Sequence, residues 1–224
     1  MGKTVKTVLT AIIAVVVLLM LATYIYEEFI GIVMYTFTPA VPAAPAKPAI
    51  IADIARGETR NLVFGGYTWR VLDVQGDSAL LITESIIERR PYHMWERDSH
   101  VTWEICTLRT YLNSMFYMGF DVQEQAIIRE TENTNAGNPW HGTDGGSVTT
   151  DRVFLLSLEE AEQYFQNNSE RIANINEQSF WWWLRSPGAN PDDAVMIDRD
   201  GSIVFAGDHV RATQGMRPAL WIEL

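Results

Sequence analysis

The sequence predicts an α+β fold for the part of the chain that follows residue 57. Segments rich in β-branched and aromatic residues lie at both ends of this part, helical patterns lie between them, and β-α-β alternation is absent. Aromatic residues at globular frequency and several glycine-centred turns accompany them. The region can therefore bury enough apolar surface to offset its chain entropy, and we expect one compact domain over residues 58–224.

The domain is expected to open with a β-hairpin and to continue with a helix. Residues 62–74 and 79–83 have strand-like composition and flank a polar turn at residues 75–78. Between Trp103 and Tyr117, apolar residues recur with spacings of three and four, which is typical of a helix with one buried face. The residues of this predicted face are Ile105, Leu108, Leu112, Met115 and Phe116.

A second helix is expected after Ser157. This residue is a suitable N-cap, and Glu160 stands three positions later, which is the arrangement of a capping box. The helix then continues through residues 161–165. The apolar run immediately before it, residues 153–156, is consistent with a buried strand.

The last 45 residues, Phe180 to Leu224, are expected to form the centre of the core. Large aromatic residues beside two arginines are typical of a folded interior and not of a tail. The Asp200-Gly201 pair predicts the tip of a hairpin. The strands predicted here are Trp181–Arg185, Ala194–Asp198, Ser202–Ala206 and Pro218–Glu223.

The amino-acid composition excludes several classes of function. Beyond residue 50, fourteen arginines stand against twenty-six aspartates and glutamates, a net charge near −12, whereas nucleic-acid binding needs a basic surface. No lysine follows Lys47, which excludes a Schiff-base lysine and a Walker-type phosphate loop in the domain. Cys106 is the single cysteine, so neither an intrachain disulfide nor a multi-cysteine metal site can form. An exported domain without disulfides favours a bacterial source.

Residues 1–37 are expected to anchor the chain in a membrane. Thr7–Tyr26 are twenty uncharged, mostly apolar residues, which as a helix span about 30 Å, the thickness of a hydrocarbon core. Two lysines precede the run and two glutamates follow it, so we expect a cytoplasmic N-terminus and an extracytoplasmic domain. A cleaved signal peptide is the alternative, although Tyr24-Ile25-Tyr26 is a poor cleavage site. Residues 38–57 are rich in proline and alanine and predict a semi-rigid spacer.

Several sequence blocks carry a resemblance to known domains. They are Trp69–Leu72, Leu108–Asn113, Thr149–Ala161, Trp182–Gly188 and Gly215–Trp221. With these blocks in this order, residues 60–224 resemble an uncharacterised, mainly Gram-positive bacterial domain family with WWLRSPG and G[VM]RPALW blocks. More distantly, the chain is similar to the C-type-lectin-like fold of formylglycine-generating enzymes. That resemblance implies neighbouring termini and long loops that carry ligands, but no catalysis, because those enzymes use a cysteine pair.

Candidate ligand-binding residues fall in loops and in the terminal strands. The long polar loop at residues 132–150 and an earlier loop carry aromatic residues, which either form a platform for a glycan or peptide or fold back on the domain. The two arginines of the terminal strands either contact a ligand or pin loops to the core. The candidate set is Trp95, Trp140, His141, Asp144, Arg185, Asn190, Asp192, Asp193 and Arg217.

Calcium is a further candidate ligand, whereas no other cofactor is expected. Asn190-Pro191-Asp192 resembles a motif of true C-type lectins, and Asp192, Asp198 and Asp200 are the candidate calcium ligands. No Trp-Asn-Asp partner motif is present, and hairpin chemistry alone accounts for Asp198 to Gly201. The histidines show no metal-ligand spacing and no serine lies in a nucleophile-elbow pattern, so a His-based triad is not expected.

These observations favour a membrane-anchored, extracytoplasmic recognition module of C-type-lectin-like type that binds a cell-wall glycan, a peptide or a protein. The first alternative is a cell-envelope enzyme that uses carboxylates such as Asp144, Asp151 or Asp193. The second is a structural subunit of a membrane complex, in which residues 1–37 matter more than the domain. An enzyme is the less favoured reading because no convincing catalytic set is present.

Overall fold

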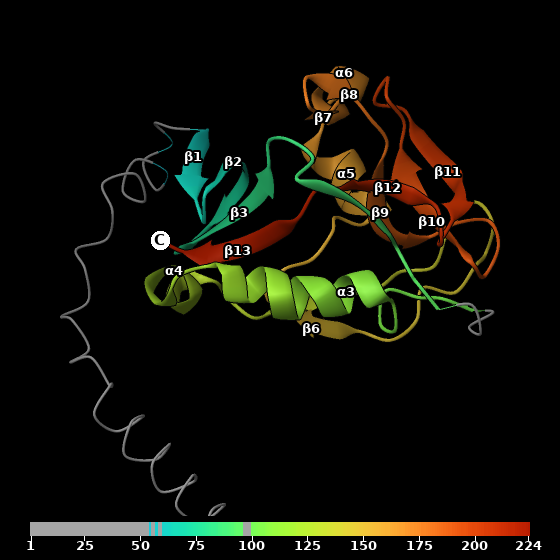
Figure 1. Cartoon of the computed structure of the whole chain (residues 1–224), viewed down its shortest axis with the longest axis horizontal. Helices are drawn as coiled ribbons and strands as arrows, with labels where there is room; N and C mark the ends of the chain where they lie inside the picture. Colours follow the sequence, from blue (N-terminus) through green and yellow to red (C-terminus); the bar gives the residue numbers. More distant parts are fainter. Residues whose placement is uncertain (1–53, 55–56, 58–59, 96–99) are drawn as a thin grey trace, which may run out of the picture. The chain divides into compact units, whose positions relative to one another are not determined.

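The computed structural model describes residues 54, 57, 60–95 and 100–224 (Figure 1). Lys47–Leu224 form one compact unit. The described part is a mixture of helices and strands in which sheets predominate, so the predicted α+β class is confirmed. The predicted membrane anchor at residues 1–37, and all of the predicted spacer except Ile54 and Gly57, lie outside the described residues. Among the described residues, no helix has the length and apolar character needed to cross a membrane.

The first sheet brings the two ends of the described domain together. Its four strands lie in the order β1-β2-β3-β13, and the last strand of the chain pairs antiparallel with β3. The single strand predicted at residues 62–74 is two strands, because Gly65 and Gly66 take positive φ angles and turn the chain back on itself. The predicted turn after β2 is confirmed. The strands are β1 (Asn61–Phe64), β2 (Tyr67–Gln75), β3 (Ser78–Thr83) and β13 (Ala219–Glu223).

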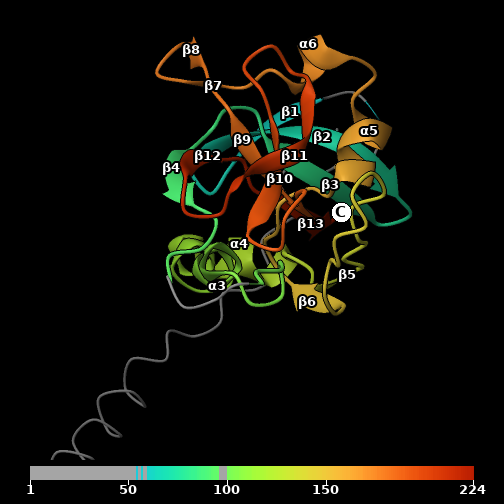
Figure 2. The ribbon, with the colours of Figure 1, turned by 90° about the vertical axis from the view of Figure 1, so that its right-hand side faces the viewer.

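The second sheet contains the tryptophan-rich segment. Its order is β11-β10-β9-β12-β4, and all pairs are antiparallel except β9 with β12. The predicted hairpin with Asp200-Gly201 at its tip is confirmed, and Gly201 has a φ of 80°. Figure 2 shows β9 and β10 at the middle of this sheet. The strands are β4 (Glu88–Pro91), β9 (Trp182–Pro187), β10 (Asp193–Ile197), β11 (Ile203–His209) and β12 (Thr213–Met216).

The first helical segment differs from its prediction at both ends. The helix begins at Thr107, four residues later than expected, and Cys106 is its N-cap, whose Sγ accepts a hydrogen bond from the Arg109 amide (3.3 Å). Ile105 and Met115 are 49% and 65% exposed, so their predicted place on the buried face is wrong. Ile105 precedes the helix, and a π-helical turn alters the spacing around Met115. The turns are α3 (Thr107–Tyr111), η1 (Leu112–Phe116) and η2 (Tyr117–Gly119).

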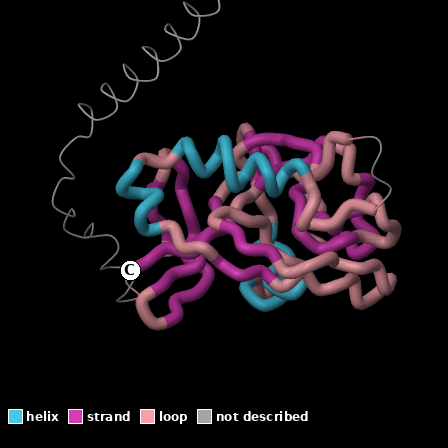
Figure 3. Tube along the Cα trace, turned by 90° about the horizontal axis from the view of Figure 1, so that it is seen from below, coloured by secondary structure: helices cyan, strands magenta, loops and turns pink. Residues whose placement is uncertain are grey.

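Figure 3 shows the helical segment from α3 onward in cyan, with loops gathered at the end of the domain where α3 begins. The predicted capping box at Ser157 and Glu160 is confirmed, since each side chain accepts from the other residue's amide. The remaining helices are α4 (Val122–Ile127), α5 (Leu158–Tyr164) and α6 (Asn168–Arg171). The short strand pairs are β5 (Thr131–Asn133) with β6 (Thr149–Asp151), and β7 (Asn174–Ile175) with β8 (Gln178–Ser179).

The core is built around tryptophans, as the sequence analysis expected. Trp69, Trp103, Trp182 and Trp183 are all completely buried. Residues 153–156 are also buried but do not form the predicted strand, because only Phe154 makes a bridge, to Ala219 of β13. The backbone of Val153 bonds to the Asn113 side chain, the Leu155 carbonyl oxygen accepts from the Arg185 side chain, and the Leu156 carbonyl oxygen accepts a single bond from the Arg185 amide, so no strand ladder continues.

Candidate functional site

The β5–β6 loop, residues 134–148, is held in place by a buried asparagine. The side-chain amide of Asn138 donates to the carbonyl oxygens of Pro187 (2.9 Å) and Phe205 (2.8 Å). Its Oδ1 atom accepts from the backbone amides of Trp140 (2.9 Å) and His141 (3.3 Å). Asn138 therefore joins the tip of the loop to β9 and β11, and it fixes the backbone that presents Trp140 and His141.

Two more buried asparagines hold the base of the same loop. Asn133 Nδ2 donates to Asp151 Oδ2 (3.0 Å), and Asn135 Nδ2 donates to the Ser147 carbonyl oxygen (2.6 Å). The tip is closed by two backbone bonds, from the Asn138 amide to the Thr143 carbonyl oxygen and from the Gly142 amide to the Asn138 carbonyl oxygen. Because buried amides satisfy its backbone, the loop has a defined conformation although it contains no regular structure.

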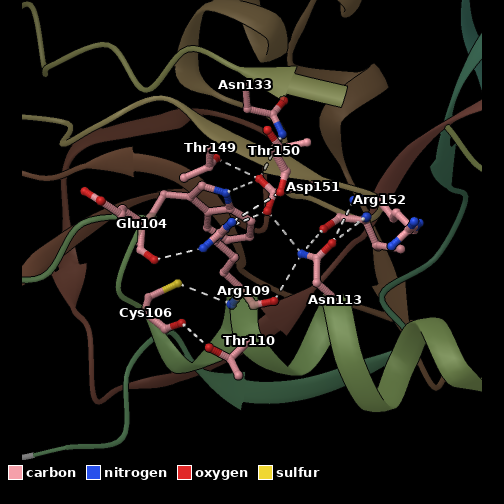
Figure 4. A network of polar contacts seen from close by, with 12 residues as sticks. Glu104, Cys106, Arg109, Thr110, Asn113, Asn133, Thr149, Thr150, Asp151 and Arg152 are labelled. Carbon is pink, nitrogen blue, oxygen red and sulfur yellow. Dashed lines mark hydrogen bonds and ion pairs between the residues drawn. The ribbon is translucent and has the colours of Figure 1, made fainter. Parts of the chain in front are cut away.

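Beneath the loop lies a buried polar network centred on Asp151 (Figure 4). Its Oδ1 accepts from Arg109 Nε (2.6 Å) and Asn113 Nδ2 (3.3 Å). Its Oδ2 accepts from Trp103 Nε1 (3.0 Å), Asn133 Nδ2 (3.0 Å) and Thr149 Oγ1 (2.8 Å). All the acceptor capacity of this carboxylate is used inside the domain, so the placement of Asp151 does not suit the catalytic role that the enzyme hypothesis gave it.

Trp140 is the most exposed tryptophan of the described domain, with 69% of its surface accessible. Its ring leans on Phe205 of β11, with centroids 5.2 Å apart and an angle of 58° between the planes. His141 beside it is also exposed. Trp95 is 64% exposed but belongs to a separate loop, next to residues 96–99 that lie outside the described part. A shared platform of Trp95 and Trp140 therefore stays a prediction.

An open depression of about 490 Å³ lies between the loop and the segment that leads into α3. This volume is within the range of small-ligand clefts, about 300–1,000 Å³. Glu104 Oε2 accepts from the Ser147 amide (3.2 Å), and Asp144 Oδ1 accepts from the Gly146 amide (3.1 Å). The residues that line the depression are His100, Thr102, Glu104, Ile105, Asp144, Gly146 and Ser147.

Arg185 lies in the interior, where both Nη nitrogens of its guanidinium have partners and the buried Nε has none. Its guanidinium forms a two-pronged ion pair with Glu160, and Nη1 also donates to the Leu155 carbonyl oxygen (2.8 Å). Only 4% of the side chain is exposed. The arginine joins β9 to the start of α5, as the structural alternative in the sequence analysis expected, and an outside ligand does not reach it in this conformation.

Arg217 is completely buried. Its Nε donates to the Thr83 carbonyl oxygen (2.7 Å), and its guanidinium carbon lies 5.0 Å from the Trp182 ring centroid and 5.5 Å from that of Phe165. Burial, and secondarily the neighbouring Arg70, lowers the pKa of Arg217 to about 9. The predicted ligand contact of Arg217 conflicts with this burial, because no part of the side chain faces solvent.

The candidate calcium ligands do not meet. Asp192 and Asp198 flank opposite ends of β10, roughly 20 Å apart at about 3.3 Å per strand residue. Asp198 and Asp200 accept from the amides of Arg199 (2.6 Å) and Ser202 (2.9 Å), as turn chemistry predicts. A calcium ion therefore cannot bind all three carboxylates. Within the described residues, no group of three or more His, Cys, Asp or Glu side chains is placed to hold a metal.

Asn190 and its neighbours form a turn before β10. Asn190 Nδ2 donates to Asp193 Oδ2 (2.6 Å), and the same oxygen accepts from the Asn190 amide (3.2 Å). Asp192 Oδ2 lies 3.3 Å from His209 Nε2, with both side chains partly exposed. These contacts make Asp193 a turn-forming residue, and they do not bring it to the depression beside Asp144.

The sequence analysis missed the residues that organise the site. Asn133, Asn135 and Asn138 occur in a polar stretch that reads as an exposed loop, yet all three are buried. Their close spacing, at intervals of two and then three residues, is the one signal that the sequence offered. Glu104 was missed because it lies in the region predicted as a helix.

The structure thus defines a small α+β domain that presents an ordered, partly aromatic loop beside an acidic depression. A family model described as "Domain of unknown function (DUF6273)" matches residues 76–224, which is most of the chain. The chain therefore belongs to the DUF6273 family. Neither a search of curated proteins nor a search of solved structures found a match.

Proposed function

We propose that this protein is an extracytoplasmic recognition module, which binds a cell-envelope glycan, peptide or protein through the β5–β6 loop. One observation carries the proposal: Trp140 is 69% exposed although its backbone is fixed by Asn138. A large exposed indole on an ordered loop is typical of a binding surface, because a ligand can cover it without ordering the loop first.

Binding is favoured over catalysis by the placement of the carboxylates. The enzyme hypothesis needs two acids that face a common cleft. The Asp151 carboxylate accepts hydrogen bonds within the buried network, and the Asp193 carboxylate accepts hydrogen bonds within its turn. Of the three acids named for the enzyme hypothesis, only Asp144 lines the depression. Asp144 with Glu104 is the pair on which an enzyme would now depend.

The finer fold assignment is also part of the proposal. We infer a C-type-lectin-like fold from the presence of the first and last strands, β1 and β13, in one sheet, the tryptophan-rich β9 and the long irregular loop. We further infer that Thr7–Tyr26 anchor the chain, with the N-terminus in the cytoplasm, from the charges on either side of that run. A phosphatase reporter fused after Leu224 should be active only if the domain is exported.

The test of binding uses the compact unit, residues 47–224, with its fold checked by circular dichroism. Retention on cell-wall glycan, on envelope peptides and on envelope proteins would be compared for the native sequence and for Trp140→Ala. We expect Trp140→Ala to weaken retention about tenfold or more, as for a central aromatic contact. Met115→Ala is the matched control, since Met115 is similarly exposed but lies on η1. Equal retention of all three proteins would refute a role for the loop.

A further inference from the structure

Arg217 is a buried cation whose charge has no carboxylate partner. It lies between β12 and β13, where the chain passes from the second sheet to the first, and none of its surface is exposed. Its Nε donates to the Thr83 carbonyl oxygen, but Nη1 and Nη2 have no hydrogen-bond partner. Among the described residues, Arg217 forms no ion pair. Four of the five N–H donors of its guanidinium therefore have no acceptor in the interior.

The nearest charged side chains leave a positive charge in excess. The Glu84 carboxylate is already paired with Arg70, whose Nε donates to Oε2 (2.8 Å). Burial and then Arg70 lower the pKa of Arg217 to about 9, and the effect of Arg70 exceeds the opposing effect of Glu84. Arg217 thus stays protonated at neutral pH. Arg70, Glu84 and Arg217 together contain two cations and one anion, so one positive charge is not compensated.

The other neighbours of Arg217 do not supply the missing acceptors. The Trp182 and Phe165 rings lie 5.0 Å and 5.5 Å from its guanidinium carbon and attract the cation through their π-electrons, but they offer no acceptor oxygen or nitrogen. The buried Thr83 hydroxyl also has no hydrogen-bond partner, although the carbonyl oxygen of the same residue accepts from Arg217. Buried polar groups are nearly always satisfied by protein, water or an ion, and an unpaired buried charge is the costliest exception.

We propose that Arg217 and Thr83 hold a small monovalent inorganic anion, of about the size of chloride, inside the domain. The two Nη groups and the Thr83 hydroxyl donate to it. A water molecule would accept these hydrogen bonds but would leave the positive charge in place, whereas an anion neutralises it. The burial that excludes a glycan or a peptide from Arg217 is compatible with an enclosed ion. This inference does not depend on the proposed recognition function.

The first test measures urea unfolding of the full-length chain in non-ionic detergent, in sodium chloride and in sodium gluconate at equal ionic strength. An anion that binds only the folded state lowers the unfolding equilibrium constant, about tenfold when its concentration is about ten times its dissociation constant. Arg217→Met removes the charge and keeps a similar length. Arg171→Met is the matched control, since Arg171 is also buried but its Nε, Nη1 and Nη2 all have partners.

We expect chloride, relative to gluconate, to lower the unfolding equilibrium constant of the native chain and of Arg171→Met roughly tenfold. In Arg217→Met the change should be less than about twofold, because the binding site is lost. An equal chloride effect in Arg217→Met and in the native chain would overturn the inference, since the salt would then act on the protein surface as a whole. The absence of a chloride effect in the native chain would overturn it as well.

Crystals of the native protein grown in sodium bromide locate the ion directly, and this measurement decides the question if Arg217→Met does not fold. Bromide substitutes for chloride and is identified by its anomalous scattering. We expect an anomalous peak at hydrogen-bonding distance from Arg217 Nη1 or Nη2. A water molecule at that position, or bromide bound only at exposed arginines, would overturn the inference.

Discussion

Removal of the Asp151 carboxylate should destabilise the domain strongly. In Asp151→Ala, the indole of Trp103 and the amide of Asn133 lose their common acceptor, and both residues are buried. A buried donor without a partner costs about 1–3 kcal/mol, and loss of the partner of Arg109 adds to this. We therefore expect the free energy of unfolding to fall by about 4 kcal/mol, a large part of the 5–15 kcal/mol typical of domains.

Urea unfolding of residues 47–224, followed by tryptophan fluorescence, measures this change. With a slope of about 2 kcal/mol per molar urea, the midpoint should fall by about 2 M. Glu162→Gln is the control, because an exposed glutamate on α5 should change stability by less than about 0.5 kcal/mol. A midpoint shift below about 0.5 M for Asp151→Ala would refute the reasoning that the network is a buried, fully used acceptor site.

Three further outcomes are expected. Burial raises the pKa of the Cys106 thiol from 9.0 to about 12, so native protein should react with thiol reagents only after unfolding. Between pH 8.5 and 10.5 only the unfolded chain releases the Cys106 proton, so the free energy of unfolding should fall by about 2 kcal/mol relative to the Cys106→Ala variant. Asn138→Ala should cost about 2 kcal/mol and speed hydrogen exchange of the Trp140 amide, unlike Met118→Ala. Arg185→Met should cost about 3 kcal/mol, measured by urea unfolding, because it leaves Glu160 without its partner; a loss under 1 kcal/mol would contradict the structural role.

Features encoded by adjacent residues were predicted correctly. The capping box at Ser157 and Glu160, the turn at residues 75–78 and the Asp200-Gly201 hairpin each depend on residues that are close in sequence. Their geometry is therefore set locally, and a single sequence contains the whole signal.

Two strands that pair with a distant partner, β4 and β12, were not predicted. β4 and β12 are short, rich in polar residues, and pair with each other across more than 120 positions. Neither has the alternation of apolar residues that identifies a half-buried strand. They form because their hydrogen-bonding partners arrive from elsewhere in the chain, which no local pattern reports.

The residues of the candidate site also divide into those that the local sequence identifies and those whose role depends on distant parts of the chain. Trp140, His141 and Asp144 were proposed because aromatic and acidic residues in a long polar loop stand out by composition, and their role in binding stays a prediction. Arg185 and Arg217 were ambiguous, since a charged residue in an apolar segment suits either a ligand or an internal partner. Their burial resolves that ambiguity.

The sequence by itself determined the α+β class, the tryptophan core, the helix cap and the loop that carries the candidate residues, because each follows from composition or short-range spacing. The tertiary structure alone decided that Asp151 lies in a sealed network, that Asn138 fixes the loop, and that Glu104 and Asp144 share a depression. Those outcomes depend on which segments, distant in sequence, pack around a polar group and exclude water from it. The burial of that group is therefore set by its neighbours in space and not by its neighbours in sequence.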